Sequence, residues 1–233
     1  GLWQIKHNDK GELLDKTLAT SFTIDGPMLS TFDAMFTYAD KVGLREDESN
    51  LAIDGNTTRF TEKSATFYAS IQPTPELYLE TELIVGDKID YSNNRLGKIN
   101  RLKSNINWNI NKHLEVKLKQ TFSQLNADGD NVFIARLTDL RTTYQFNVQS
   151  FLRFSLIFNN TSKNPNNYLY SAPEDIDRHS KALSTELLYA YKINPQTVFY
   201  LGYSDAHNGE EAIEDLVQEQ RSVFTKFSYA WQK

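Results

Sequence analysis

The residues of this chain best suited to catalysis are Ser204, Asp205 and His207, which stand together as Ser204-Asp205-Ala206-His207. A hydrolase triad uses these residue types, because the histidine activates the serine while the carboxylate orients the histidine. Residues so close in sequence, at the end of a strand, do not readily adopt that geometry. We therefore predict no catalytic residue and no enzymatic activity, with a membrane hydrolase as the weaker alternative.

Metal binding is the second chemistry that the residue types suggest. The segment Asp128-Gly129-Asp130-Asn131 offers oxygen ligands in a turn, but it lacks the spaced carboxylates and the final Glu of a calcium loop. The histidines are far apart and lack the spacing of metal ligands: His7, His113, His179 and His207. Because the chain has no cysteine, it has neither thiolate ligands nor disulfides. We predict no metal and no cofactor.

Charged side chains show a further pattern: they recur at every second position of runs whose other positions are mostly apolar. In a β-strand, alternate side chains share one face, so these charges would line one side of a sheet. On a lipid-facing side each Lys or Arg would cost about 2–4 kcal/mol at mid-membrane. We predict that they face the lumen of a barrel: Glu80, Glu82, Lys103, Glu115, Lys117, Lys119, Asp139, Arg141, Arg153, Glu186, Lys192 and Lys226. Composition does not separate a water-filled lumen from a plugged or salt-bridged one.

The elements that position these charges are strands with a period of two. Residues 183–191 alternate Leu, Thr, Leu, Tyr and Tyr with mostly polar neighbours, and the tight link 194–197 then reverses the chain. The same hairpin plan recurs upstream, which predicts an all-β, antiparallel transmembrane barrel of about twelve strands. Their expected spans are 2–7, 14–25, 28–40, 58–72, 76–88, 97–110, 113–124, 132–147, 150–162, 179–193, 197–206 and 219–232.

The predicted links alternate between short and long. Short links are expected near 26–27, 73–75, 111–112, 148–149 and 194–196, and long ones near 8–13, 41–57, 89–96, 125–131, 163–178 and 207–218. Short and long links therefore lie at opposite ends of the strands. In outer-membrane barrels short turns face the periplasm and long loops face outside.

Composition excludes some classes and leaves others open. The 25 basic and 30 acidic residues give a net charge of −5, so the chain offers no basic field for nucleic acid. No run approaches the roughly 20 apolar residues of a membrane-spanning helix, and the mean hydropathy is −0.54. Barrel strands need only about 9–11 residues, half of them facing the lumen, so low hydropathy is compatible with a membrane barrel. The uniform strand pattern predicts one domain over residues 1–233, and the missing initiator Met and leader predict a mature chain or a fragment.

Aromatic residues gather within a few positions of the short turns or of the C-terminus. We predict that they form an interfacial girdle: Trp108, Tyr144, Phe146, Tyr189, Tyr191, Tyr229 and Trp231. The alternative is an aromatic core stripe in a soluble sandwich. In the final run, Val223 to Trp231 alternates apolar positions, similar to the C-terminal signal that barrel-assembly machinery recognises, although Gln232 and Lys233 follow the last aromatic.

Several stretches resemble one family. Residues 86–95, 140–147 with 151–153, 194–205 and 224–231 are similar to the barrel of proteins that contain a carbohydrate-binding family 9-like domain. The resemblance covers most of residues 75–233 and is weaker before them. In that family a sugar-binding-like sandwich precedes a large barrel of unknown function. The resemblance therefore implies the C-terminal portion of a longer protein and carries over no catalytic residue.

These patterns together predict a non-enzymatic barrel in the bacterial outer membrane that passes or handles small solutes such as saccharides or peptides. The expected partners are outer-membrane lipid, lipopolysaccharide and the barrel-assembly machinery, and not nucleic acid. Two alternatives stay open: a soluble all-β carbohydrate-binding module, and a barrel that anchors an upstream sugar-binding domain or a partner protein.

Overall fold

A computed structural model describes residues 1–8, 11, 13–43, 58–194, 197–209 and 216–229 of the chain. It is a single antiparallel sheet of 12 strands that follow one another in chain order. The strands are β1 (Leu2–His7), β2 (Leu13–Gly26), β3 (Ser30–Val42), β4 (Arg59–Thr74), β5 (Leu77–Asp90), β6 (Arg95–Asn109), β7 (Leu114–Ala127), β8 (Asp130–Gln145), β9 (Ser150–Lys163), β10 (His179–Asn194), β11 (Thr197–Gly209) and β12 (Val217–Tyr229). The predicted all-β fold of about twelve antiparallel strands is confirmed.

The strands are long because the alternation of apolar and polar residues continues over many positions. Apart from the six-residue β1, each strand has 13 to 16 residues. That length exceeds the roughly 9–11 residues with which a tilted strand crosses a bilayer. Two single-turn 3₁₀ helices, Pro165–Asn167 and Pro173–Asp175, lie between β9 and β10. The described part of the chain contains no helix that is long and apolar enough to span a membrane.

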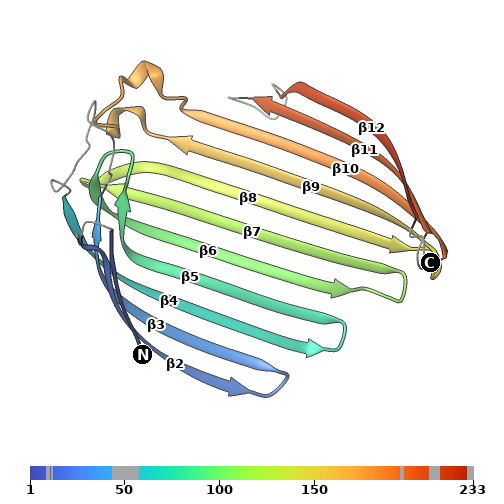
Figure 1. Ribbon diagram of the computed structural model, residues 1–233, viewed down its shortest axis with the longest axis horizontal. Helices are drawn as coiled ribbons and strands as arrows, with labels where there is room; N and C mark the ends of the chain where they lie inside the picture. The colour runs from blue at the N-terminus through green and yellow to red at the C-terminus, as the bar shows by residue number, and fades with distance from the viewer. Residues whose placement is uncertain (9–10, 12, 44–57, 195–196, 210–215, 230–233) are drawn as a thin grey trace.

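The sheet is strongly curved and forms the wall of a barrel, with β1 and β12 at its two edges (Figure 1). Over the described residues β1 pairs with β2 alone, and β12 pairs with β11 alone. The wall is therefore open between these two strands.

Two of the links predicted to be long are tight turns, so that prediction is wrong for 89–96 and 125–131. Strand β7 continues to Ala127 and β8 begins at Asp130, which leaves only Asp128 and Gly129 between them. Both have positive φ, 54° and 82°, as in the two-residue turn whose twist matches that of the adjoining strands. Residues 91–94 likewise form a four-residue turn between β5 and β6. Turn-forming residues suggest loops at both places, but strand pairing continues up to the turns on either side.

The buried core is small and lies at the end of the sheet opposite the short turns. Ile99, Leu125, Ala127 and Val132 form it, and Tyr168 packs against it from the segment after β9. This segment, residues 164–169, thus folds back onto β6, β7 and β8. It covers a part of the sheet that would otherwise expose apolar side chains.

Buried polar contacts hold residues 164–169 in place. Arg95 is the centre of these contacts: its guanidinium donates to Asp90 (3.1 Å), to Asp128 (2.6 Å) and to the carbonyl oxygen of Asn167 (2.6 Å). The buried Asn93 accepts from the backbone N–H of Leu169 at 2.6 Å. Two turns of the sheet therefore anchor a segment about seventy residues later in the sequence.

Candidate functional site: the charged inner face

Strand register assigns side chains to the two faces of the sheet, because directly opposite residues point to the same side. Glu82 lies opposite Lys103, Lys119 opposite Asp139, and Ser155 is opposite both Arg141 and Glu186. Extended along each strand with period two, these pairs place all the predicted lumen-facing residues on one face, which we call the inner face: Glu80, Glu82, Lys103, Glu115, Lys117, Lys119, Asp139, Arg141, Arg153, Glu186, Lys192 and Lys226. That this face encloses a lumen stays a prediction.

The opposite side, the outer face, carries large apolar side chains. Leu83 lies opposite Leu102, and Tyr189 lies opposite Leu201. These leucines and Leu187 keep between 37% and 44% of their surface exposed. No second layer covers them, since the described chain forms only this one sheet.

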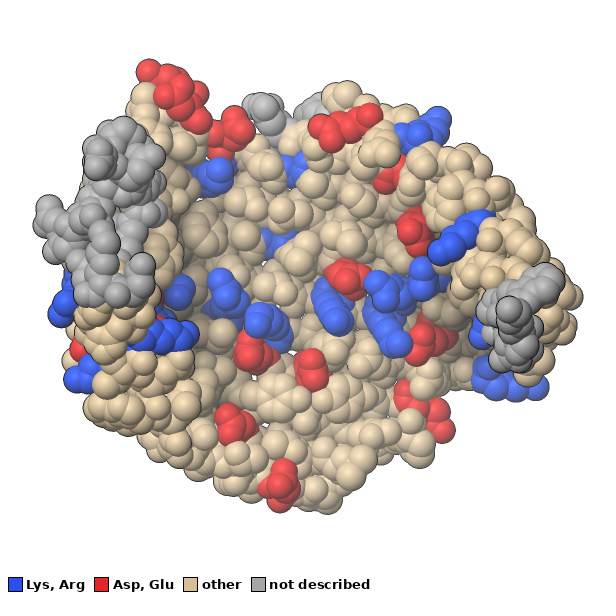
Figure 2. Space-filling model, viewed as in Figure 1, with Lys and Arg blue, Asp and Glu red and all other residues tan. Residues whose placement is uncertain are grey.

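The inner face presents a band of mixed charge across the concave side of the sheet (Figure 2). Three ion pairs lie in it: Lys103 with Glu82 at 2.6 Å, Lys117 with Glu115 at 2.9 Å, and Arg153 with Glu186 at 3.4 Å. All the partners are at least 31% exposed, and exposed pairs contribute only about 0–1 kcal/mol each to stability. The band therefore provides a wet, charged surface more than it strengthens the fold.

At one end of the band Glu80 is held in place by hydrogen bonds. The hydroxyl groups of Tyr78 and Tyr68 donate to its Oε2 at 2.9 and 3.2 Å, and Asn105 donates to Oε1 at 3.2 Å. With both oxygens occupied, this carboxylate is fixed in orientation.

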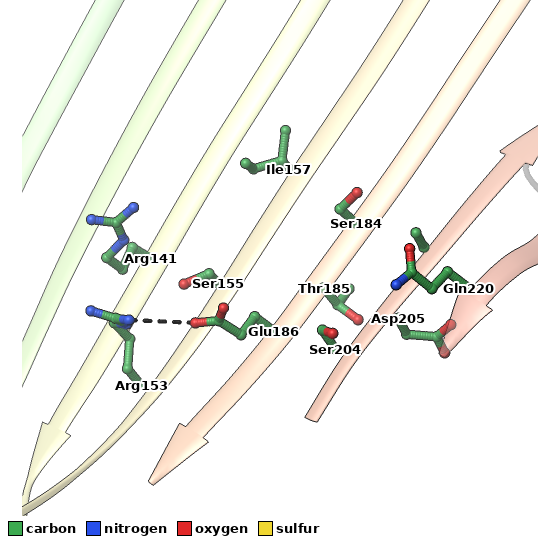
Figure 3. Close-up of a pocket in the computed structure, with 11 residues that line it drawn as sticks. Arg141, Arg153, Ser155, Ile157, Ser184, Thr185, Glu186, Ser204, Asp205 and Gln220 are labelled. Carbon is green, nitrogen blue, oxygen red and sulfur yellow. Dashed lines mark hydrogen bonds and ion pairs between the residues drawn. The ribbon is translucent and has the colours of Figure 1, made fainter. Parts of the chain in front are cut away.

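Further along the band, strands β8 to β12 enclose a hollow of about 530 Å³ (Figure 3). Its charged lining residues are Arg141, Arg153, Glu186 and Asp205, while the polar side chains include Ser155, Ser204 and Gln220. The last three were missed in the sequence, because an uncharged residue in an alternating strand gives no signal of its own. Their placement follows from register, since Ser204 lies opposite Glu186.

Ser204, Asp205 and His207, whose residue types could form a catalytic triad, do not assemble into one. Ser204 shares the inner face with Glu186, whereas its neighbour Asp205 belongs to the other face by strand alternation. Asp205 accepts a hydrogen bond from Tyr203 (2.9 Å) and lies 3.7 Å from both His207 and Arg221. Within the described ranges no three His, Asp or Glu side chains gather as they would around a metal ion.

Several of the predicted girdle aromatics contact one another near the short turns. The ring of Phe146 lies 5.0 Å from Tyr144 and 6.5 Å from Tyr189, and His113 stacks on Tyr144 at 5.9 Å. By register Trp108, Tyr144, Tyr189, Tyr191 and Tyr229 belong to the outer face, while Phe146 lies in the β8–β9 turn. Trp231 lies outside the described residues. The role of these rings as a membrane girdle stays a prediction.

Toward the opposite end of the strands, cations lie over aromatic rings of the outer face. Lys16 is 5.5 Å from the ring of Trp3, Lys63 is 5.9 Å from Tyr38, and Arg136 is 5.6 Å from Phe122. Each cation lies on the same face as its ring, since cross-strand pairs share a side. The apolar outer face thus ends in a charged border, which the sequence analysis did not single out.

No protein-family model matches this sequence, and no curated protein matches it either. The resemblance to proteins with a carbohydrate-binding family 9-like domain therefore stays a prediction. Among solved structures the chain is similar to the NanC porin, with 12% identity and a TM-score of 0.37 over 93% of this chain and 94% of that one. It is also similar to OmpT, an outer membrane protein of Vibrio cholerae, with 11% identity and a TM-score of 0.43 over 96% of this chain and 66% of that one.

Proposed function

We propose that the twelve strands form the wall of an outer-membrane β-barrel whose inner face lines a wet passage for small polar solutes. One observation carries the proposal: over the described strands the exposed leucines lie on the outer face and the band of mixed charge lies on the inner face. The outer-face cations Lys16, Lys63 and Arg136 lie toward the strand ends away from the short turns. Soluble monomers rarely expose contiguous apolar patches larger than a few hundred Å². Hydrocarbon is the environment that would accommodate the exposed leucines and aromatic residues of the outer face.

The same separation accounts for the inner charges. Facing water, Lys103 or Arg141 keeps its hydration, whereas at the middle of a bilayer each would cost about 2–4 kcal/mol. A barrel with lipid outside and water inside is therefore the arrangement in which neither face is penalised.

The ends of the outer face support a position across the outer membrane. The aromatic rings near the short turns suit one interface, and the cations Lys16, Lys63 and Arg136 suit the phosphates of lipopolysaccharide at the other. The proposed partners are accordingly outer-membrane lipid, lipopolysaccharide and the assembly machinery that inserts such barrels.

The direct test is reconstitution of the full chain in planar bilayers after refolding in detergent. We expect discrete conductance steps, together with migration on electrophoresis that changes when the sample is boiled. Purification without detergent as a monodisperse monomer would instead support a soluble binding module and overturn the proposal.

One observation favours a second candidate, a barrel that anchors another domain rather than conducting. Residues 164–169 pack onto β6–β8 and cover part of the inner face at the end opposite the short turns. A barrel without conductance that co-purifies from native membranes with a bound partner would favour this candidate.

A further inference from the structure

Two arginines of the inner face have more hydrogen-bond donors than the surrounding residues satisfy. Arg141 on β8 lies opposite Ser155, and Arg153 precedes Ser155 by two residues on β9. The two side chains are therefore diagonal neighbours on one face, roughly 7–8 Å apart at their origins. Figure 3 shows both guanidinium groups on the same side of the hollow.

Neither arginine has a tightly bound charged partner among the described residues. In the part of the chain that the structure describes, Arg141 makes no hydrogen bond or ion pair. The Nε of Arg153 is buried without an acceptor, and its Nη2 lies 3.4 Å from Glu186. Charge-assisted N–H to carboxylate bonds are usually about 2.7–2.9 Å long, so this pair is a loose one.

Further positive charge stands beside the pair. Lys117 lies opposite Arg141 on the strand before, with its amine 2.9 Å from Glu115. Adjacent like charges repel unless an anion lies between them.

The lining of the hollow also carries Glu186 and Asp205. Glu186 pairs only loosely with Arg153, and Asp205 accepts from Tyr203 and lies 3.7 Å from Arg221. The two guanidinium groups are therefore the charges of the hollow that are available to a negative group.

We propose that Arg141 and Arg153 bind the oxyanion of a small solute, a carboxylate or phosphate, that enters the hollow. A planar guanidinium presents paired N–H donors that match two oxygens of such a group. The hydroxyl groups of Ser155, Ser184 and Ser204 and the amide of Gln220 line the same hollow and suit the hydroxyl groups of a sugar. At about 530 Å³ the hollow is of the size of small-molecule sites. The ligand class is therefore an acidic sugar, and the proposal names the solute of the passage proposed above.

Calorimetric titration of the refolded barrel in detergent tests this without requiring conduction. D-glucuronate and glucose 6-phosphate are the anionic probes, and D-glucose is their neutral match. We expect both anionic probes to bind and glucose to show no binding at the same concentrations. R141Q and R153Q should each weaken binding at least tenfold, whereas K98Q, on the outer face and away from the hollow, should leave it unchanged.

A fourth variant separates binding from a merely structural role. Glu186 competes with the ligand for Arg153, so E186Q should strengthen binding of glucuronate severalfold. If the Arg153–Glu186 pair only stabilised the fold, E186Q would not increase the affinity for glucuronate. If R141Q fails to refold, the comparison of glucuronate with glucose and the sign of the E186Q effect still decide.

The outcomes distinguish this inference from the proposed passage. Equal binding of glucose and glucuronate, or an affinity unchanged in both arginine variants, would overturn the site even if the barrel conducts. Anion binding that is lost in the arginine variants, in a barrel that shows no conductance, would support the site and overturn the passage.

Discussion

Gly86 shows how a single residue shapes the sheet. Its φ of +132° is a conformation that side chains with a Cβ rarely adopt, and a Cβ there would lie 2.4 Å from the carbonyl oxygen of Lys63. The following Asp87 accepts a hydrogen bond from the backbone N–H of Lys63 at 3.1 Å and pairs with Lys98. The glycine therefore allows β4 and β5 to approach closely at Ser64 and Gly86, where the pairing of these two strands ends.

We predict that G86A destabilises the refolded barrel, by about 1–3 kcal/mol from the backbone conformation alone and by more from the clash. Urea unfolding in phospholipid vesicles measures the difference. G129A is the matched control, because Gly129 has a φ of +82° with nothing within 4 Å of the added Cβ. A loss in G86A no larger than that in G129A would contradict the close approach.

At the scale of a strand, alternation makes adjacent residues experience different surroundings. Leu102 and Asn107 both belong to β6, with Leu102 opposite Leu83 near the middle of the outer face and Asn107 opposite Tyr78 on the inner face. If the outer face meets lipid, an arginine on that face should lower the free energy of unfolding more than an arginine on the inner face does.

We predict that L102R lowers the free energy of unfolding in vesicles by about 2–4 kcal/mol, the cost of arginine near mid-membrane. N107R should change it by no more than about 0.5 kcal/mol, as is usual for surface substitutions. Denaturant titration of both variants in one lipid gives the comparison. Similar losses in the two would refute lipid contact for the outer face.

A second element-scale prediction concerns residues 164–169. Arg95 is buried, and removing one partner from a buried ion pair is costly because the other charge is left unpaired. We expect R95Q to raise the rate of chymotrypsin cleavage near Leu169 and Tyr170 at least tenfold. K98Q, which removes a solvent-exposed amine from its pair with Asp87, should not change that rate. An unchanged rate in R95Q would show that the anchor lies elsewhere.

Tyr168 makes the packing of this segment sensitive to alkali. Burial raises its pKa above the usual value of 10.0, and the negative charge of Asp90 adds to that rise, while Arg95 opposes it. The packed state therefore favours the neutral phenol, so the contribution of Tyr168 is complete below about pH 10 and is lost as the pH rises through its raised pKa. Cleavage of the segment should accelerate in that alkaline range, and Y168F should abolish the acceleration.

Across the whole molecule, the features that depend on local pattern could be predicted from the sequence. Period two alone separates Lys103 from Leu102, so the faces and the strand count followed without knowledge of distant residues. The turn at Asp128-Gly129 could not be distinguished from a longer loop, because composition does not show where the pairing of β7 with β8 ends. The hollow at Arg141 and the contact of Arg95 with Asn167 depend on register and on long-range folding, which no local pattern encodes.

The placement of the links predicts an orientation for the whole barrel. Short turns, such as residues 146–149, lie at one end of the sheet, and the long segment 164–178 lies at the other (Figure 1). In outer-membrane barrels these ends face the periplasm and the exterior respectively. Because the chain has no cysteine, single introduced thiols report on each end separately.

We predict that a membrane-impermeant maleimide added to intact cells labels Y170C but not V148C. Both native side chains are exposed, at 57% and 89%, so access to the reagent and not burial decides the labelling. After the outer membrane is permeabilised both variants should react, which controls for expression and folding. The parent chain should stay unlabelled throughout. Labelling of V148C alone in intact cells would mean that the barrel has the opposite orientation, and the cations near Lys63 would then face the periplasmic leaflet rather than lipopolysaccharide.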